Sequence, residues 1–205
     1  MSETSFSGLR LLTAPGQVMT PRVASEQLVA SVVARLGRTA RPARIADVGT
    51  GSGAIAIAIA SAVPAAEVWA TDTSEAAVSL ARANVLRHGL ANRVFVREGN
   101  LLEGVPGSID VVVANLPYLP HSSRSAGVEG EPPEAVFALG DGLDPYRQLL
   151  KVSEQRLAGG GAVVIQLHRQ VLQAERDDLW NLRAELERRA RAHSPVAQAA
   201  QIGWR

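Results

Sequence analysis

The stretch Asn115-Leu116-Pro117-Tyr118 combines residue types that suit a site for a flat, nitrogen-bearing group. The Asn115 side chain offers one hydrogen-bond acceptor and two donors. Pro117 fixes its own φ and biases Leu116 away from the helical region, and Tyr118 can cover one face of a planar group. The apolar run 109–114 before it is short enough to be a buried strand of a parallel sheet. The alternative is an Asx-type turn that closes a strand.

A second candidate site lies upstream, where the expected strand 44–48 runs into Gly49-Thr50-Gly51-Ser52-Gly53. Residues 54–60 follow, and their alternation of Ile with Ala is compatible with a strand. Their Ala-rich composition and glycine-rich beginning favour a buried helix that ends before Pro64. Strand, glycine turn and helix form the layout of a nucleotide-cofactor loop, because glycines let the backbone approach a ligand and helix N-termini present unpaired N–H groups.

The next expected strand, 67–71, ends at Asp72, nineteen residues after Gly53. An acidic side chain at this position can accept both hydroxyls of an adenosine ribose. A dinucleotide site usually has the spacing Gly-x-Gly-x-x-Gly. Here the spacing is Asp-x-Gly-x-Gly-x-Gly, with Asp47 two residues before the first glycine.

This spacing resembles motif I of the class I methyltransferases that use S-adenosylmethionine (SAM). In that family the loop meets the methionine part of the cofactor rather than a pyrophosphate. The resemblance therefore favours SAM over NAD. It implies a set of cofactor-binding residues: Asp47, Gly49, Thr50, Gly51, Gly53, Asp72, Thr73, Asn100, Leu101 and Asn115.

Further motifs resemble the HemK/PrmC family of release-factor glutamine N5-methyltransferases. Residues 115–118 match the Asn/Asp-Pro-Pro-Tyr motif of enzymes that methylate planar nitrogens. Residues 18–26 look like that family's Pro-Arg-Pro-Glu-Thr-Glu segment, from which Val23, Ala24 and Ser25 depart. Residues 70–74 look like its Ala-x-Asp-x-Ser. Residues 131–135 and 139–147 look like its Glu-Pro…Ala-Leu…Gly…Asp-Gly-Leu…Tyr-Arg signature. The resemblance implies four catalytic residues: Asn115, Leu116, Pro117 and Tyr118.

Several positions depart from the family pattern. Leu116 replaces the first Pro of the tetrapeptide, a spelling seen in rRNA adenine dimethyltransferases. Asn100 takes the place of an Asp that contacts the adenine amino group, so the hydrogen bond loses its charge assistance. Residues 166–168 read Gln-Leu-His instead of Glu-Ile-Gly. The family usually carries a helical N-terminal domain, and only seven residues precede Gly8 in this sequence. The sequence shows no clear pattern for a final β-hairpin.

Composition fits a compact enzyme of one domain. The chain has 205 residues, 46% of them apolar, which is enough for a full core. It contains no Cys, which excludes disulfides and thiolate metal sites, and its four His show no ligand spacing. We therefore expect no metal site. The net charge of +1 offers no broad attraction for nucleic acid. The first residues lack a basic and apolar leader, so we expect a cytoplasmic protein.

The remaining elements alternate as an α/β sheet requires. We expect helices over 23–36, from the Ser74 cap to Gly89, and over 145–157, and strands over 93–97 and 162–165. A long Ser-, Gly- and Pro-rich loop is expected over 119–140. The domain would comprise residues 1–205, with 1–22 as an N-terminal lead-in and 171–205 as a C-terminal helix and tail.

We therefore predict a doubly wound α/β fold with a mostly parallel, Rossmann-like sheet and a doubtful final hairpin. The resemblance implies methyl transfer from SAM to a planar nitrogen, with a protein glutamine amide as the acceptor. A peptide chain release factor or another protein is the expected partner, rather than nucleic acid or a membrane. The expected state is a monomer or weak dimer. Two alternatives stay open: an adenine N6-methyltransferase of RNA or DNA, and a SAM-binding module that assists a partner.

Overall fold

The centre of the molecule is a parallel sheet of five strands in the order β5-β4-β3-β6-β9. The structure is a computed structural model that describes residues 2–37, 42–120, 128–138, 140 and 142–166. The strands are β3 (Ala43–Val48), β4 (Ala66–Asp72), β5 (Val94–Glu98), β6 (Ile109–Ala114) and β9 (Leu157–Ile165). The chain runs outward from β3 to β5 and then returns to β6 beside β3. The strand order therefore reverses between β3 and β6, and the doubly wound prediction is confirmed.

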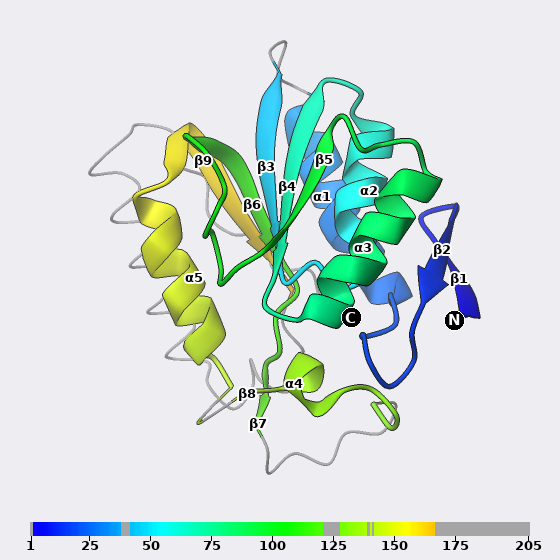
Figure 1. The fold of residues 1–205 in the computed structure, drawn as a ribbon. Helices are drawn as coiled ribbons and strands as arrows, with labels where there is room; N and C mark the ends of the chain where they lie inside the picture. The colour runs from blue at the N-terminus through cyan, green and yellow to red at the C-terminus, as the bar shows by residue number, and fades with distance from the viewer. Residues whose placement is uncertain (1, 38–41, 121–127, 139, 141, 167–205) are drawn as a thin grey trace.

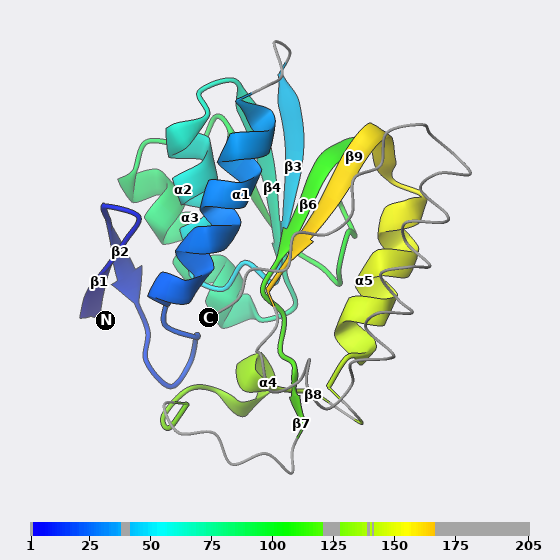
Figure 2. The ribbon, with the colours of Figure 1, turned by 180° about the vertical axis from the view of Figure 1, so that it is seen from behind.

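Helices cover both faces of this sheet. The 3-10 turn η1 (Val23–Ser25) leads into α1 (Glu26–Leu36), which lies with α2 (Ala54–Ala62) and α3 (Glu75–Arg87) on one face. On the other face lies α5 (Asp144–Glu154) (Figures 1 and 2). Side chains of β3 alternate between two apolar cores: Ile45 packs in the core shared with α1–α3, and Ala46 in the core that contains residues of α5. This two-sided burial explains why the strands are almost continuously apolar.

Two of these helices follow local sequence signals. In α2, residues 54–60 are all buried, so the helix needs no polar side, and the helical interpretation of the Ile/Ala repeat is confirmed. In α3, the Ser74 hydroxyl accepts the Ala77 N–H at 3.4 Å, as expected for an N-cap. Gly89, just after that helix, has φ +66°, which suits a glycine that ends a helix.

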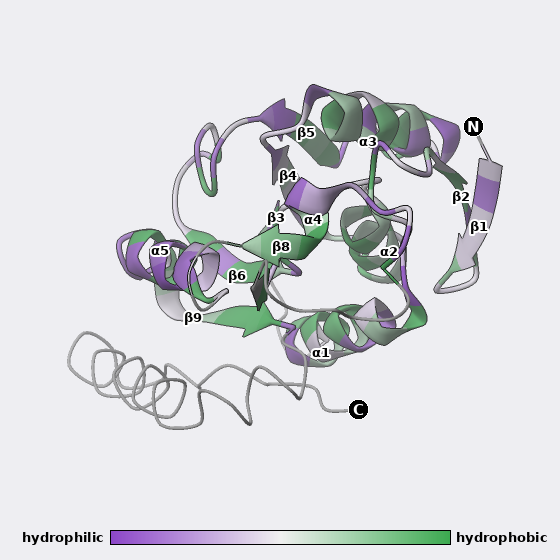
Figure 3. Ribbon diagram, turned by 90° about the horizontal axis from the view of Figure 1, so that it is seen from below, coloured by the Kyte–Doolittle hydropathy of each residue, from purple (hydrophilic) through white to green (hydrophobic). Residues whose placement is uncertain are grey.

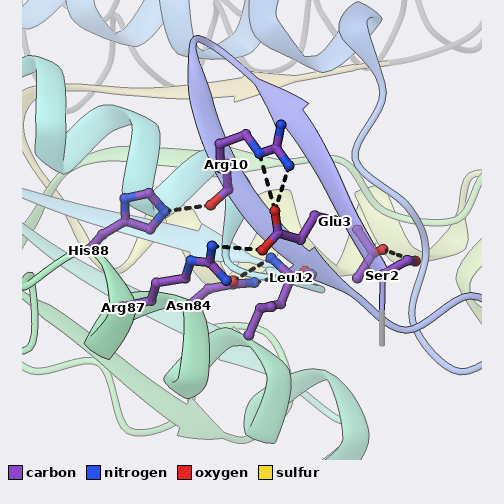
Figure 4. A network of polar contacts seen from close by, with 8 residues as sticks. Ser2, Glu3, Arg10, Leu12, Asn84, Arg87 and His88 are labelled. Atoms are coloured by element: carbon purple, nitrogen blue, oxygen red, sulfur yellow. Dashed lines mark hydrogen bonds and ion pairs between the residues drawn. The ribbon is translucent and has the colours of Figure 1, made fainter.

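The structure adds a β-hairpin at the N-terminus that we did not predict. Strands β1 (Ser2–Phe6) and β2 (Leu9–Thr13) pair antiparallel around Ser7 and Gly8, which have φ of 49° and 76°. Positive φ at both turn residues is the pattern of a tight two-residue hairpin. The buried Asn84 side chain of α3 holds the hairpin by bonding the N–H and the carbonyl of Leu12 (Figure 4).

The expected loop over 119–140 contains short elements in its described part. Strands β7 (Leu119–Pro120) and β8 (Phe137–Ala138) pair parallel, and α4 (Pro133–Val136) precedes β8. Viewed from below in Figure 3, α4 and β8 lie across the end of the sheet. Strand β9 also begins earlier than predicted, at Leu157, because Leu157 already pairs with Ile109 of β6. Pairing resumes at Ala162 opposite Val111, after a register shift.

Part of the prediction concerns residues beyond those described. The expected helix within 171–205 and the question of a final hairpin both lie outside the described residues. Among the helices that the structure does describe, none combines the length and the apolar character that crossing a membrane requires.

Candidate active site

A cavity of about 480 Å³ opens at the carboxyl ends of β3, β4, β5 and β6, beside the reversal in strand order. This is where ligands bind in open α/β sheets. Residues that follow the strands form one wall, and residues within 132–138 and 144–148 supply another. The lining that follows the strands consists of Val48, Gly49, Gly51, Asp72, Thr73, Ser74, Gly99, Asn100, Leu101, Asn115, Leu116 and Pro117.

Asn115 stands where this cavity meets two smaller hollows. One, of about 60 Å³, is lined by residues that include Thr20, Ser25 and Thr50. The other, of about 40 Å³, is lined by residues that include Tyr118. Asn115 lines all three spaces. Its side chain can therefore contact a molecule in the large cavity and one that approaches through a hollow.

The glycine loop is shaped to bring backbone close to the cavity. Gly49, Gly51 and Gly53 have φ of 69°, 56° and 81°, a region that side chains other than glycine rarely adopt. The N–H groups of Gly49 and Thr50 both donate to the Thr71 carbonyl, at 2.9 and 3.0 Å, and so dock the loop on β4. A Cβ on Gly49 would lie 2.7 Å from Leu116 Cδ2, so any larger residue here would force the Leu116 side chain to move.

The Asp72 carboxylate organises the cavity wall at the end of β4. One oxygen accepts the Gly51 N–H at 2.9 Å, and the other accepts the Ser74 N–H at 3.0 Å. Each carboxylate oxygen can accept a further hydrogen bond. Asp72 can therefore hold the glycine loop and still accept two hydroxyls of a bound ribose.

Asp47 lies behind the loop rather than in the cavity. It is fully buried, and its Oδ2 accepts the Thr50 hydroxyl at 2.7 Å and the Ala56 N–H at 3.1 Å. Its Oδ1 is buried and has no hydrogen-bond partner among the described residues. Burial raises the pKa of this carboxyl to about 7, against the lowering effect of its hydrogen bonds. In this structure Asp47 holds the loop to the start of α2.

The wall after β5 contains a strained residue. Leu101 has φ of 51°, unusual for a residue with a side chain, and its carbonyl accepts the buried Thr71 hydroxyl at 2.6 Å. The neighbouring Asn100 is exposed, and its N–H donates to Glu103 at 2.9 Å. Strain held by a neighbouring element is typical of a binding site.

The Leu116 carbonyl is tied to the far helix by Tyr146. The Tyr146 hydroxyl is fully buried, 2.9 Å from the Leu116 carbonyl and 2.8 Å from the Gln166 carbonyl. Burial raises the pKa of Tyr146 well above its usual value, so the hydroxyl remains a donor. Burial also raises the pKa of Tyr118, in spite of the opposing charge of Arg22. Tyr118 therefore keeps its proton as well.

Met19, like Asn115, lines the large cavity and both smaller hollows. Contacts of Glu131 with Thr20 and Arg22, here called the clamp, hold the segment that carries Met19. Glu131 accepts the Thr20 N–H at 3.1 Å and lies 3.8 Å from the Arg22 guanidinium. These contacts join residues 18–22 to the segment that carries α4. Met19 is thereby held beside Asn115.

The structure brings most of the predicted site residues to one place. The large cavity is lined by Gly49, Gly51, Asp72, Thr73, Asn100, Leu101, Asn115, Leu116 and Pro117. Thr50 and Tyr118 line the smaller hollows, and Asp47 and Gly53 line none of the three. Gly53 lies at the start of α2 and packs against Ala81 of α3. A Cβ added to Gly53 would lie 3.2 Å from the Ala81 Cβ.

The sequence analysis did not single out Met19, Ser25 or Tyr146 as site residues. Each lies in a segment that resembles the HemK/PrmC family, and for Met19 and Tyr146 that resemblance was the available signal. Ser25 is one of the positions that depart from the family pattern, so the resemblance did not point to it. Among the described residues, no group of three or more His, Asp or Glu side chains is placed to hold a metal ion.

Comparison with known proteins agrees with this geometry. The release factor glutamine methyltransferase of Deinococcus radiodurans is 40% identical over 168 residues, which cover 80% of this chain and 59% of that protein. The protein of the same name from Xylella fastidiosa (strain Temecula1) is 43% identical over 153 residues, covering 72% and 54%. This chain thus spans a little over half the length of these curated relatives.

Solved structures share the fold. The ribosomal protein L11 methylase of Lactobacillus delbrueckii subsp. bulgaricus has a TM-score of 0.57 at 24% identity, covering 84% of this chain and 72% of that one. The 16S rRNA N2 G1207 methyltransferase of T. thermophilus, in complex with AdoMet and guanosine, has a TM-score of 0.56 at 21% identity, covering 79% and 40%.

The family model described as the methyltransferase small domain matches residues 23–129, more than half of the 205-residue chain. That stretch includes the glycine loop, Asp72 and the Asn115 motif. The glycine backbone that approaches the cavity and the two carboxylate oxygens of Asp72 fit an adenosine-containing methyl donor. The chain therefore belongs to the methyltransferase small domain family, and its cofactor is S-adenosyl-L-methionine.

Proposed function

We propose that this chain is the catalytic part of a SAM-dependent N-methyltransferase that acts on a glutamine side-chain amide of a protein. A peptide chain release factor is the proposed partner, in line with the names of the curated relatives. The observation that carries the proposal is that Asn115 and Leu116 line both the large cavity and a smaller hollow, and that each has an oxygen that can accept a hydrogen bond. The proposal places the enzyme in the cytoplasm, with residues 1–205 as one domain.

The two acceptors suit a primary amide. Such an amide has two N–H groups, and the Asn115 Oδ1 and the Leu116 carbonyl can each accept one of them. Accepting both fixes the plane of the amide and shifts electron density toward its nitrogen. When bound, SAM supplies a methyl group on a positively charged sulfur. The nitrogen's lone pair, perpendicular to the amide plane, must face that methyl group for transfer.

The other residues of the motif contribute shape. Pro117 lines the cavity with a fixed φ, and the half-buried Tyr118 lines the hollow beside it. Tyr118 keeps its proton at neutral pH and does not act as a base. The clamp of Glu131 on Thr20 and Arg22 holds the Met19 segment over Asn115. Rate enhancement therefore rests on positioning and on exclusion of water.

The rival acceptor is adenine N6 of RNA or DNA, and one observation favours it. Leu116 gives the motif the spelling found in rRNA adenine dimethyltransferases. The net charge of +1 argues against a nucleic-acid substrate, because binding the phosphate backbone depends on concentrated positive charge. A SAM-binding module without activity would have no use for the paired acceptors.

The test offers methyl-labelled SAM together with a Gly-Gly-Gln peptide, an intact release factor, RNA or DNA. We expect label on the glutamine of the protein substrates. Asn115→Ala should reduce turnover by roughly a hundredfold or more while SAM affinity changes only a few-fold, because its main partner is the acceptor nitrogen. Asn92→Ala, at an exposed turn position, is the matched control.

Other outcomes of this experiment would contradict the proposal. Label on RNA or DNA instead of protein would identify the adenine enzyme. Near-normal turnover of the Asn115→Ala variant would mean that the motif serves as a strand-closing turn. SAM binding without label on any acceptor would favour the binding module.

A further inference from the structure

Asn115 is held by a residue ninety positions earlier in the chain. Its Nδ2 donates to the Ser25 hydroxyl oxygen at 3.1 Å. The contact joins the end of β6 to η1, the turn that precedes α1. It connects the acceptor-binding side chain to a segment that lies next to it only in the folded chain.

The chemistry of an amide makes this contact consequential. The oxygen of the Asn115 side chain can only accept hydrogen bonds, and the nitrogen can only donate them. The –NH2 group of the amide that receives the methyl group likewise donates hydrogen bonds. If Asn115 were turned by half a rotation, two N–H groups would face each other and the acceptor would be repelled. The orientation of this one side chain therefore decides whether the site can bind an amide.

Ser25 is well placed to hold the orientation that the structure shows, in which its hydroxyl oxygen accepts from Nδ2. It is 5% exposed, and its backbone N–H donates to the Arg22 carbonyl at 2.9 Å within η1. Its side chain lines the small hollow shared with Thr20 and Thr50, and it is not part of the lining of the large cavity. With Nδ2 drawn to the hollow, the oxygen of the same amide turns away from it.

We propose that Ser25 is a positioning residue that holds the Asn115 side chain with its oxygen free to accept the substrate N–H. The proposal rests on the proposed function for its substrate, but the Ser25–Asn115 hydrogen bond can be tested without one. Because Ser25 lies outside the large cavity, its loss should affect transfer to the acceptor and leave cofactor binding intact.

The test compares Ser25→Ala with Ser25→Thr, which keeps the hydroxyl. Ser25→Ala should lower kcat by about ten- to a hundredfold, with the SAM dissociation constant within about twofold of wild type. Ser25→Thr should restore kcat to within a few-fold. Ser153→Ala is the matched control, since Ser153 is also buried but donates to Leu149 within α5. A kcat of Ser25→Ala equal to that of Ser153→Ala would overturn the proposal.

A second measurement needs no substrate. The side-chain amide signal of Asn115 is assigned by its loss in the NMR spectrum of Asn115→Ala, and its hydrogen exchange is then followed. We expect exchange to be faster in Ser25→Ala and near wild type in Ser25→Thr; unchanged exchange in Ser25→Ala overturns the proposal. If the wild-type enzyme labels no glutamine, the proposed function fails, and this exchange measurement still decides whether Ser25 holds Asn115.

Discussion

Gly49 and Leu116 lie so close together that a Cβ on the glycine would be 2.7 Å from Cδ2 of the leucine. The two residues follow β3 and β6, the neighbouring strands between which the strand order reverses. The glycine loop and the motif proposed to bind the methyl acceptor therefore lie against each other. A side chain that grows on one of them must displace the other.

The first prediction concerns this contact. Gly49→Ala places a side chain at φ +69°, which costs about 1–2 kcal/mol, and it also pushes against the buried Leu116. Gly89→Ala is the matched control, because Gly89 has φ +66° and open space around it. Urea unfolding should show a greater loss of stability for Gly49→Ala, and only that variant should lose SAM affinity, by roughly tenfold or more. Equal effects of the two variants would contradict the contact.

The second prediction concerns Asp72. Asp72→Ala removes the acceptors of the Gly51 and Ser74 N–H groups and of the proposed ribose hydroxyls. Isothermal titration should show SAM binding weakened by about 1.5–3 kcal/mol, since hydrogen bonds to a charged group are lost. Glu75→Ala, an exposed acid in the first turn of α3, should bind SAM normally. If Asp72→Ala binds SAM as tightly as the wild type, Asp72 does not contact the cofactor.

The elements that carry the loop could be predicted because their signals are local. The strand, the glycines and the apolar helix are contiguous over 43–62, and Asp72 ends the next strand. Buried parallel strands must be apolar on both faces, and this makes β3 and β6 recognisable from composition. Once these strands are recognised, their positions in the sequence place Asp72 and the glycine loop at the strand ends.

Other features depend on tertiary contacts and gave no such signal. Ser25 reaches Asn115 across ninety residues, and Tyr146 reaches Leu116 across thirty. Strand β1 is mostly exposed and polar, so its sequence lacks the apolar alternation of a strand, and contacts such as those of Asn84 with Leu12 hold the hairpin. Strand β9 begins at Leu157, ahead of three glycines, because Leu157 pairs with Ile109 of β6 across a register shift that the local sequence does not signal.

The third prediction is a pH dependence that arises from Asp47. Its pKa is raised from 3.8 to about 7 in the folded protein. Between these values the folded state binds a proton that the unfolded state has lost, so stability falls as pH rises through this window and levels off above pH 7. The slope would be at most about 1.4 kcal/mol per pH unit.

Asp47→Asn isolates this effect. The amide keeps an oxygen for the Thr50 hydroxyl and the Ala56 N–H but does not titrate. Denaturant unfolding at pH 5.5, 6.5 and 7.5 should show the variant gaining stability relative to wild type as pH increases. Glu67, whose pKa is lowered by the Trp69 and Arg44 hydrogen bonds, affects stability only at more acidic pH than this range and is the same in both proteins. Parallel pH profiles of the two proteins would contradict the prediction.

The last prediction concerns the Tyr146 hydroxyl, which has one hydrogen for two carbonyls, those of Leu116 and Gln166. Tyr146→Phe keeps the ring and leaves both carbonyls without this donor, which should cost about 1–3 kcal/mol of stability. The Leu116 carbonyl would also lose the bond that sets its direction. We therefore expect kcat to fall by about tenfold at temperatures where the variant is folded, with SAM affinity unchanged.

Ser153→Ala serves as the control for this variant as well, because it removes a buried hydroxyl from the same helix without touching Leu116. It should lose some stability and keep its kcat. If Tyr146→Phe is destabilised but turns over as fast as this control, Tyr146 supports only the packing between β6, β9 and α5. A loss of kcat confined to Tyr146→Phe would show that α5 sets the geometry of the acceptor site through the Leu116 carbonyl. The direction of that carbonyl would then determine how the plane of the substrate amide is held.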